Sequence, residues 1–96
     1  MRTLLVVISE AVLEKRLADD ARQFGAQGYT ICDVRGAGMH RQRDAEWEGS
    51  RSIRMEVICS AEVADRLSRH ILDRYCENYS ISMYLAEVGV LRPEKF

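Results

Sequence analysis

The sequence predicts an α+β fold in which two helices cover one face of a four-stranded antiparallel sheet. Three observations support this prediction. Strand-like and helix-like segments alternate in the order strand, helix, strand, strand, helix, strand. Each helical segment has a single apolar stripe, which is enough to cover only one sheet face. The length of 96 residues fits one domain, residues 1–96.

The first strand is predicted over Thr3–Ile8, a run of leucine and β-branched residues typical of a central strand. Ser9 is expected to cap the helix that follows, with Glu10 placed favourably against the helix dipole. The helix is expected over Ala11–Phe24, where apolar residues recur at helical spacing. Gly25 should end it.

Two alternating segments, Tyr29–Arg35 and Arg51–Cys59, predict the second and third strands. Ser60 is expected to cap a second helix with an apolar stripe that ends at Tyr75. The last strand is predicted over Ser80–Leu91. This order of elements is the ferredoxin-like pattern, β-α-β-β-α-β.

The connection over residues 36–50 is the most unusual part of the sequence, because loops longer than about 12–15 residues are uncommon in compact domains and usually functional or disordered. It begins with Gly36 and Gly38 and contains the only tryptophan, Trp47. An exposed tryptophan often anchors a partner protein. Trp47 is therefore expected either to contact a partner or to fold back onto its own subunit.

Several residues near this connection have the chemistry of an anion site. Closely spaced glycines let backbone amides approach an anion, and Thr30, just after Gly28, adds a hydroxyl donor. Arg41 and Arg43 offer planar sets of donors suited to phosphate or carboxylate oxygens. The alternative interpretation is an ordinary hairpin with solvated charges.

The sheet face left uncovered by the helices is expected to be apolar. Its members are expected to be Val6 or Leu5, Ile58, Tyr84 and Val88. A face of this kind is unfavourable in water, so the sequence predicts sheet-to-sheet association into an oligomer.

Composition excludes several classes of protein. Fourteen Lys and Arg against fifteen Asp and Glu give a net charge of −1, which argues against a nucleic-acid partner. No apolar run suits a signal peptide or a membrane span, so a cytoplasmic location without membrane insertion is expected. Cys32, Cys59 and Cys76 form no CxxC pair, and the two histidines lie far apart. We therefore predict no metal site, with Cys32 and Cys59 as buried apolar residues.

Function must come from the site, because this fold has many uses. The third strand has no aromatic residue for stacking RNA bases. The first strand is followed by neither the glycine-rich loop of an acylphosphatase nor the paired cysteines of a soft-metal chaperone. No nucleophile–base pair supports an enzyme. A sensor that binds a small molecule between subunits remains.

The chain resembles the PII-like signalling family, and its appearance is closest to the carboxysome-associated and bicarbonate-transporter-linked branch. The resemblance covers nearly the whole length, from the strand order to four short segments. These are Gly28-Tyr29-Thr30, Gly36-Ala37-Gly38, Arg41-Gln42-Arg43 and Glu87-Val88-Gly89-Val90-Leu91-Arg92.

The resemblance implies a homotrimer that binds an adenine nucleotide between neighbouring subunits. The long loop, called the T-loop and expected at about residues 36–50, would respond to the nucleotide and contact a target. Arg41 and Arg43 would also meet bicarbonate, a second ligand. The implied nucleotide-binding residues are Gly28, Thr30, Gly36, Gly38, Arg41, Arg43, Glu87, Gly89 and Arg92.

Two departures bear on the ligand. The turn Glu77-Asn78-Tyr79-Ser80 lacks the glycine-rich phosphate loop of the nitrogen-regulatory members, and the T-loop has no tyrosine. Both favour AMP or ADP, with ATP and cyclic AMP as further candidates. The expected function is to signal energy and inorganic-carbon status to a bicarbonate transporter or carboxysome-linked protein. The alternative is a CutA-like trimer, a metal-binding or general interaction module that binds no nucleotide.

Overall fold

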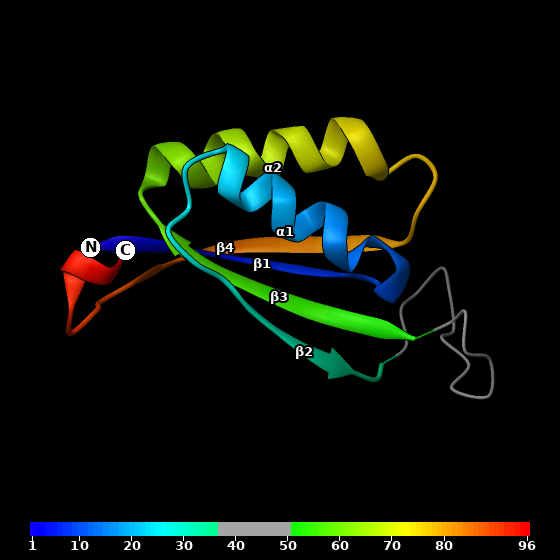
Figure 1. The fold of residues 1–96 in the computed structure, drawn as a ribbon, viewed down its shortest axis with the longest axis horizontal. Helices are drawn as coiled ribbons and strands as arrows, with labels where there is room; N and C mark the ends of the chain where they lie inside the picture. The colour runs from blue at the N-terminus through cyan, green and yellow to red at the C-terminus, as the bar shows by residue number, and fades with distance from the viewer. Residues whose placement is uncertain (37–50) are drawn as a thin grey trace.

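The computed structural model describes residues 1–36 and 51–96. Two helices lie on one face of a four-stranded antiparallel sheet with the strand order β2-β3-β1-β4 (Figure 1). This arrangement confirms the predicted ferredoxin-like α+β fold. The elements are β1 (Arg2–Glu10), the 3-10 turn η1 (Ala11–Leu13), α1 (Glu14–Gln23), β2 (Thr30–Val34), β3 (Ser52–Cys59), α2 (Ala61–Tyr75), β4 (Ile81–Val88) and the 3-10 turn η3 (Pro93–Lys95).

The hydrophobic core lies between the sheet and the helix layer. The central strands β1 and β3 contribute Leu5 and Met55, while α1 contributes Leu17 and α2 contributes Leu67 and Ile71; all five are fully buried. Burying each such side chain stabilises the fold by about 1.5–3 kcal/mol. The apolar stripes predicted for the two helices therefore face the sheet.

Neither α1 nor α2, the two α-helices of the described residues, covers the opposite face of the sheet, here called the outer face (Figure 1). Side chains alternate along a strand, so Val6 points away from Leu5 and belongs to this face. Val6 pairs with Tyr84 of β4 and Glu56 of β3, which places both on the outer face as well. The predicted choice between Val6 and Leu5 is thus resolved in favour of Val6.

The prediction that Ser9 caps the first helix is wrong. Ser9 and Glu10 still pair with Ile53 and Ser52 of β3, so the backbone stays extended through Glu10. The 3-10 turn η1 follows, and α1 begins at Glu14 without a side-chain cap. Continued strand pairing outweighs the local preference of serine for a cap.

The other predicted helix boundaries hold. The Ser60 hydroxyl accepts a hydrogen bond from the backbone N–H of Val63 at 3.2 Å and caps α2. Gly25 follows α1 with a φ of 100°, a left-handed conformation that glycine adopts without strain. The Ser60 cap and the Gly25 conformation each depend on neighbouring residues, so the sequence predicts them well.

The last strand is shorter than predicted. β4 ends at Val88 rather than Leu91, because Val88 pairs with Arg2, the first residue of its partner β1. Beyond it the chain turns into η3, and the Arg2 guanidinium donates a 3.4 Å hydrogen bond to the carbonyl of Pro93. The segment after β4 is therefore fixed to the start of β1.

A buried polar cluster joins the two helices. The Tyr75 hydroxyl of α2 donates a 2.6 Å hydrogen bond to Asp20 of α1. His70 lies with its Nε2 3.3 Å from the same carboxylate, outside hydrogen-bond geometry, and its ring packs on Phe24. Burial and the Asp20 carboxylate raise the pKa of Tyr75 above its ordinary value, which keeps the phenol protonated as a donor.

The cysteine prediction is correct for Cys59 and wrong for Cys32. Cys59 is buried on the helix side of β3, and burial raises the pKa of its thiol. Cys32 is exposed, because it lies on edge strand β2 and pairs with Arg54 on the outer face. Alternation predicts a strand but does not show that the strand lies at the sheet edge.

Candidate functional site

Five of the predicted site residues lie at the start of β2 or at and beyond the end of β4, the two opposite edge strands, and this side of the sheet is here called the turn end. Gly28 and Thr30 lie just before and at the start of β2, where Thr30 pairs with Glu56 in the middle of β3. Glu87 pairs with Thr3 at the start of β1, since the strands are antiparallel. The two others follow β4 on exposed backbone and are Gly89 and Arg92.

Gly36 lies at the opposite end, here called the loop end. It follows Val34, which pairs with Ser52, and Ser52 in turn pairs with Glu10 at the end of β1. The connection over residues 36–50 therefore leaves and re-enters the sheet at this end. Four predicted site residues lie outside the described residues, namely Gly38, Arg41, Arg43 and Trp47.

The two ends are too far apart to form one site within a single chain. Thr30 and Gly36 are six positions apart in the sequence, which corresponds to roughly 20 Å for an extended chain. A small ligand that rests on Thr30 of one chain does not reach Gly36 of the same chain. A site that uses both groups requires residues from two copies.

The three described site glycines leave open space around them. Among residues 1–36 and 51–96, a Cβ placed on Gly28, Gly36 or Gly89 would meet no atom within 4 Å. Their backbone angles are also outside the left-handed range. Packing within the described part of the chain therefore does not require glycine at these positions, whereas close approach by a ligand or a second copy would.

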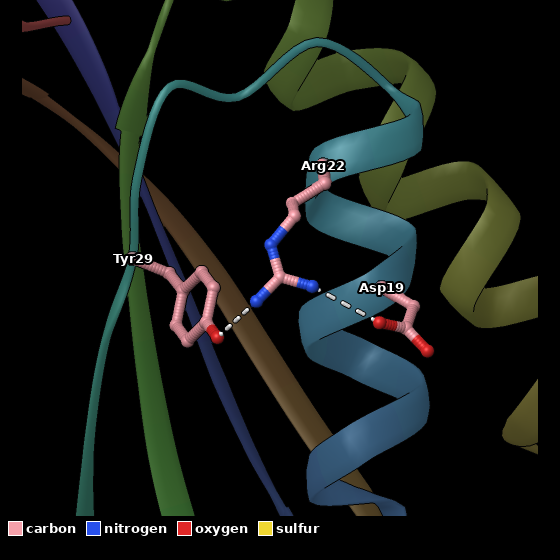
Figure 2. Close-up of polar contacts among 3 residues, drawn as sticks. All are labelled: Asp19, Arg22 and Tyr29. Carbon is pink, nitrogen blue, oxygen red and sulfur yellow. Dashed lines mark hydrogen bonds and ion pairs between the residues drawn. The ribbon is translucent and has the colours of Figure 1, made fainter.

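Arg22 of α1 holds the start of β2 in place (Figure 2). Its guanidinium donates a 2.9 Å hydrogen bond to the Tyr29 hydroxyl and a 3.0 Å hydrogen bond to the carboxylate of Asp19. It also lies 5.4 Å from the centre of the Tyr29 ring. Because Tyr29 lies between Gly28 and Thr30, this contact positions the predicted ligand-binding turn.

The same residues border a groove of about 500 Å³ between α1 and β2. Tyr29 and Ile31 form its strand side, and α1 forms the other side. None of the predicted site residues that the structure describes belongs to this lining. The groove lies on the helix side of β2, whereas Thr30 belongs to the outer face.

Sequence reasoning missed two polar contacts on the outer face. Arg54 donates a 3.1 Å hydrogen bond to Glu56, and this ion pair lies next to the fully buried Val6. At the loop end, Glu10 accepts a 2.8 Å hydrogen bond from the backbone N–H of Ser80. The spacing Arg54-x-Glu56 is a readable signal for the first contact, but no local pattern indicates the second.

Residues 1–36 and 51–96 contain neither a candidate metal cluster nor a membrane-spanning helix. Within these ranges, no three His, Cys, Asp or Glu side chains are grouped to hold a metal ion. Neither helix in these ranges combines the length and apolar character needed to cross a bilayer.

A family model for nitrogen regulatory protein P-II matches residues 2–95. The chain belongs to the nitrogen regulatory protein P-II family. A candidate PII-like signalling protein from Thermus thermophilus shares 37% identity, with 99% of this chain and 94% of that chain covered and a TM-score of 0.85. The predicted PII-like family and fold are thereby confirmed.

Structures of CPII from Thiomonas intermedia share the fold at lower identity. CPII bound to ADP, AMP and acetate is 24% identical, with 99% of this chain and 93% of that chain covered and a TM-score of 0.83. CPII bound to ADP and bicarbonate is 23% identical, with the same coverage and a TM-score of 0.86. Ligand binding in these structures is a property of CPII.

Proposed function

We propose that this PII-family protein binds an adenine nucleotide between copies of itself, with AMP and ADP favoured over ATP and cyclic AMP. The observation that carries the proposal is the division of the site residues between two ends of the sheet. Thr30 and Gly36 contact one ligand only if two subunits supply them. A homotrimer of the PII type provides such boundaries between neighbouring subunits.

The outer face supports assembly into this homotrimer. Tyr84 remains 47% exposed in a single chain, although it lies next to the buried Val6. Ile58 and Val88 add apolar side chains to the same face. Burying these groups against a second sheet is favourable at about 25 cal/mol per Å² of apolar surface.

The proposed site joins the turn end of one subunit to the loop end of its neighbour. Gly28 and Thr30 would approach the ligand with backbone amides and a hydroxyl group. Glu87, Gly89 and Arg92, at the opposite edge of the sheet, would approach the nucleotide of the neighbouring subunit. Residues 36–50 would act as the T-loop of a single PII-like domain spanning residues 1–96. The functional residues proposed in this loop are Gly38, Arg41, Arg43 and Trp47.

Arg41 and Arg43 would meet the phosphates, and bicarbonate would share them as a second anion. A ligand shifts a loop only if it binds two loop states with different affinity. The arginines would therefore contact ligand in one loop state alone. This would let the loop report ligand to a target, with Trp47 as the contact residue.

The proposed biological role is cytoplasmic signalling rather than catalysis. CPII structures with ADP, AMP and bicarbonate support adenine nucleotides and bicarbonate as the ligands to test. The proposed target is a bicarbonate transporter or a carboxysome-linked protein. The loop would signal the energy and inorganic-carbon status of the cell to this target.

A thermal-melting screen tests this function directly. A ligand present at about 100 times its dissociation constant should stabilise the native state by about 2.7 kcal/mol. We expect AMP and ADP to raise the melting temperature, and Arg43→Ala to weaken that response. If the melting temperature does not change with AMP, ADP, ATP, cyclic AMP or bicarbonate but shifts with divalent metal, the CutA-like alternative is favoured.

A further inference from the structure

Arg22 of α1 connects the helix layer to the segment that leads into β2 (Figure 2). One terminal nitrogen of its guanidinium donates a 2.9 Å hydrogen bond to the Tyr29 hydroxyl, and the other donates a 3.0 Å hydrogen bond to the carboxylate of Asp19. Asp19 lies one turn earlier on the same helix. Because the guanidinium is planar and both terminal nitrogens have an acceptor, this group is held in one orientation toward Tyr29.

The hydrogen bond to Tyr29 spans a gap in the backbone hydrogen bonding of the described residues. After α1, the backbone is held as far as Ala26, whose N–H donates to the carbonyl of Ala21 at 3.0 Å. Pairing with β3 then begins at Thr30. Tyr29 lies between these two points, so the Arg22 contact fixes the last residue before the strand.

Tyr29 and Thr30 face opposite sides of the sheet. Tyr29 packs against the core and borders the groove on the helix side, whereas Thr30 lies on the outer face, where the nucleotide is proposed to bind. Successive side chains alternate between the faces, so a contact that fixes Tyr29 also limits the direction in which the Thr30 side chain leaves the backbone. Arg22 lies on the helix side and therefore reaches the proposed site through Tyr29.

We propose that Arg22 is a positioning residue that sets nucleotide affinity on the outer face from the helix side of the sheet. This inference rests on the proposed function and concerns its turn end, at Gly28 and Thr30. A binding site that is ordered before the ligand arrives loses less conformational freedom on binding and therefore binds more tightly. Gly28 increases this effect, because glycine has the most backbone freedom to lose.

The test measures ADP affinity by titration calorimetry in Arg22→Leu, in Tyr29→Phe and in the double variant. Tyr29→Phe keeps the ring and removes only the hydroxyl that accepts from Arg22. We expect each single variant to bind ADP about threefold to tenfold more weakly than wild type, as for the loss of one hydrogen bond. Both substitutions break the same contact, so the double variant should be no more than about twofold weaker than the weaker single variant.

Two controls separate positioning from charge. Arg69→Leu on α2 removes the same charge and breaks an exposed 3.0 Å ion pair with Asp65, and it should leave ADP affinity within about twofold of wild type. Arg22→Lys keeps the charge and a donor for the Tyr29 hydroxyl, so it should bind ADP more tightly than Arg22→Leu does. A melting curve of each variant without ligand establishes that it is folded.

Failure of this inference differs from failure of the proposed function. Suppose that wild type binds ADP. If Arg22→Leu and Tyr29→Phe then bind it equally well, if their losses multiply in the double variant, or if Arg22→Lys recovers nothing, Arg22 is not a positioning residue and the proposed function stands. If wild type binds no adenine nucleotide, the proposed function fails and the role of Arg22 fails with it.

Discussion

Tyr84→Asp is expected to separate the assembly into single chains and to abolish nucleotide binding. Tyr84 lies on the outer face beside Val6, at the proposed contact between subunits. A carboxylate buried in an apolar interface without a partner costs roughly several kcal/mol. Because each proposed site needs two subunits, loss of assembly and loss of binding should occur together.

Sedimentation velocity and calorimetry with ADP measure these two effects. Leu72→Asp is a suitable control, since Leu72 is 53% exposed on α2, on the other side of the sheet. It introduces the same charge and should change neither assembly nor binding. A Tyr84→Asp protein that sediments like wild type, or that binds ADP as a single chain, would refute the proposed arrangement.

Ile71→Ala is expected to lower the free energy of unfolding by about 2–5 kcal/mol. Ile71 is fully buried between α2 and the sheet, so truncation removes apolar contacts and leaves a cavity. Urea denaturation at one fixed protein concentration measures the change. The concentration must be fixed because assembly contributes to the stability of an oligomer.

Leu72→Ala provides the matched comparison, one residue along the same helix. Leu72 is 53% exposed, and a surface substitution usually changes stability by no more than about 0.5 kcal/mol. Equal losses at both positions would mean that α2 does not present Ile71 to the core.

Much of the fold was predictable because its signals are local and periodic. The helical stripe that ends at Tyr75 and the alternation along β3 identify their elements and their buried faces. The Ser60 cap and the Gly25 conformation are also set by nearby residues. In each case the residue type and its immediate neighbours determine the structure.

The errors arose where distant strands determine the outcome. Ser9 remains in a strand because β3 pairs with it, and β4 stops at Val88, where its pairing with β1 ends at Arg2. Cys32 is exposed because β2 is an edge strand. None of these facts is visible in a window of a few residues.

The candidate site was predictable in residue type but not in arrangement. Gly28, Thr30 and Gly36 could be selected for their anion chemistry, but antiparallel pairing decides that Gly36 lies at the opposite end from the other two. The role of Arg22 in holding Tyr29 likewise depends on α1 packing beside β2. The pairing of the sheet supplies the information that residue types lack.

A mixing experiment tests most directly whether one nucleotide site is built from two subunits. Thr30→Glu alters the turn end and Gly36→Glu alters the loop end, both at exposed positions. Each variant alone should bind no ADP. Refolded together in equal amounts, they should recover roughly a quarter of the wild-type sites, because each intact site then combines the unaltered ends of two different chains. Mixed assemblies that recover no binding would contradict a site shared between subunits.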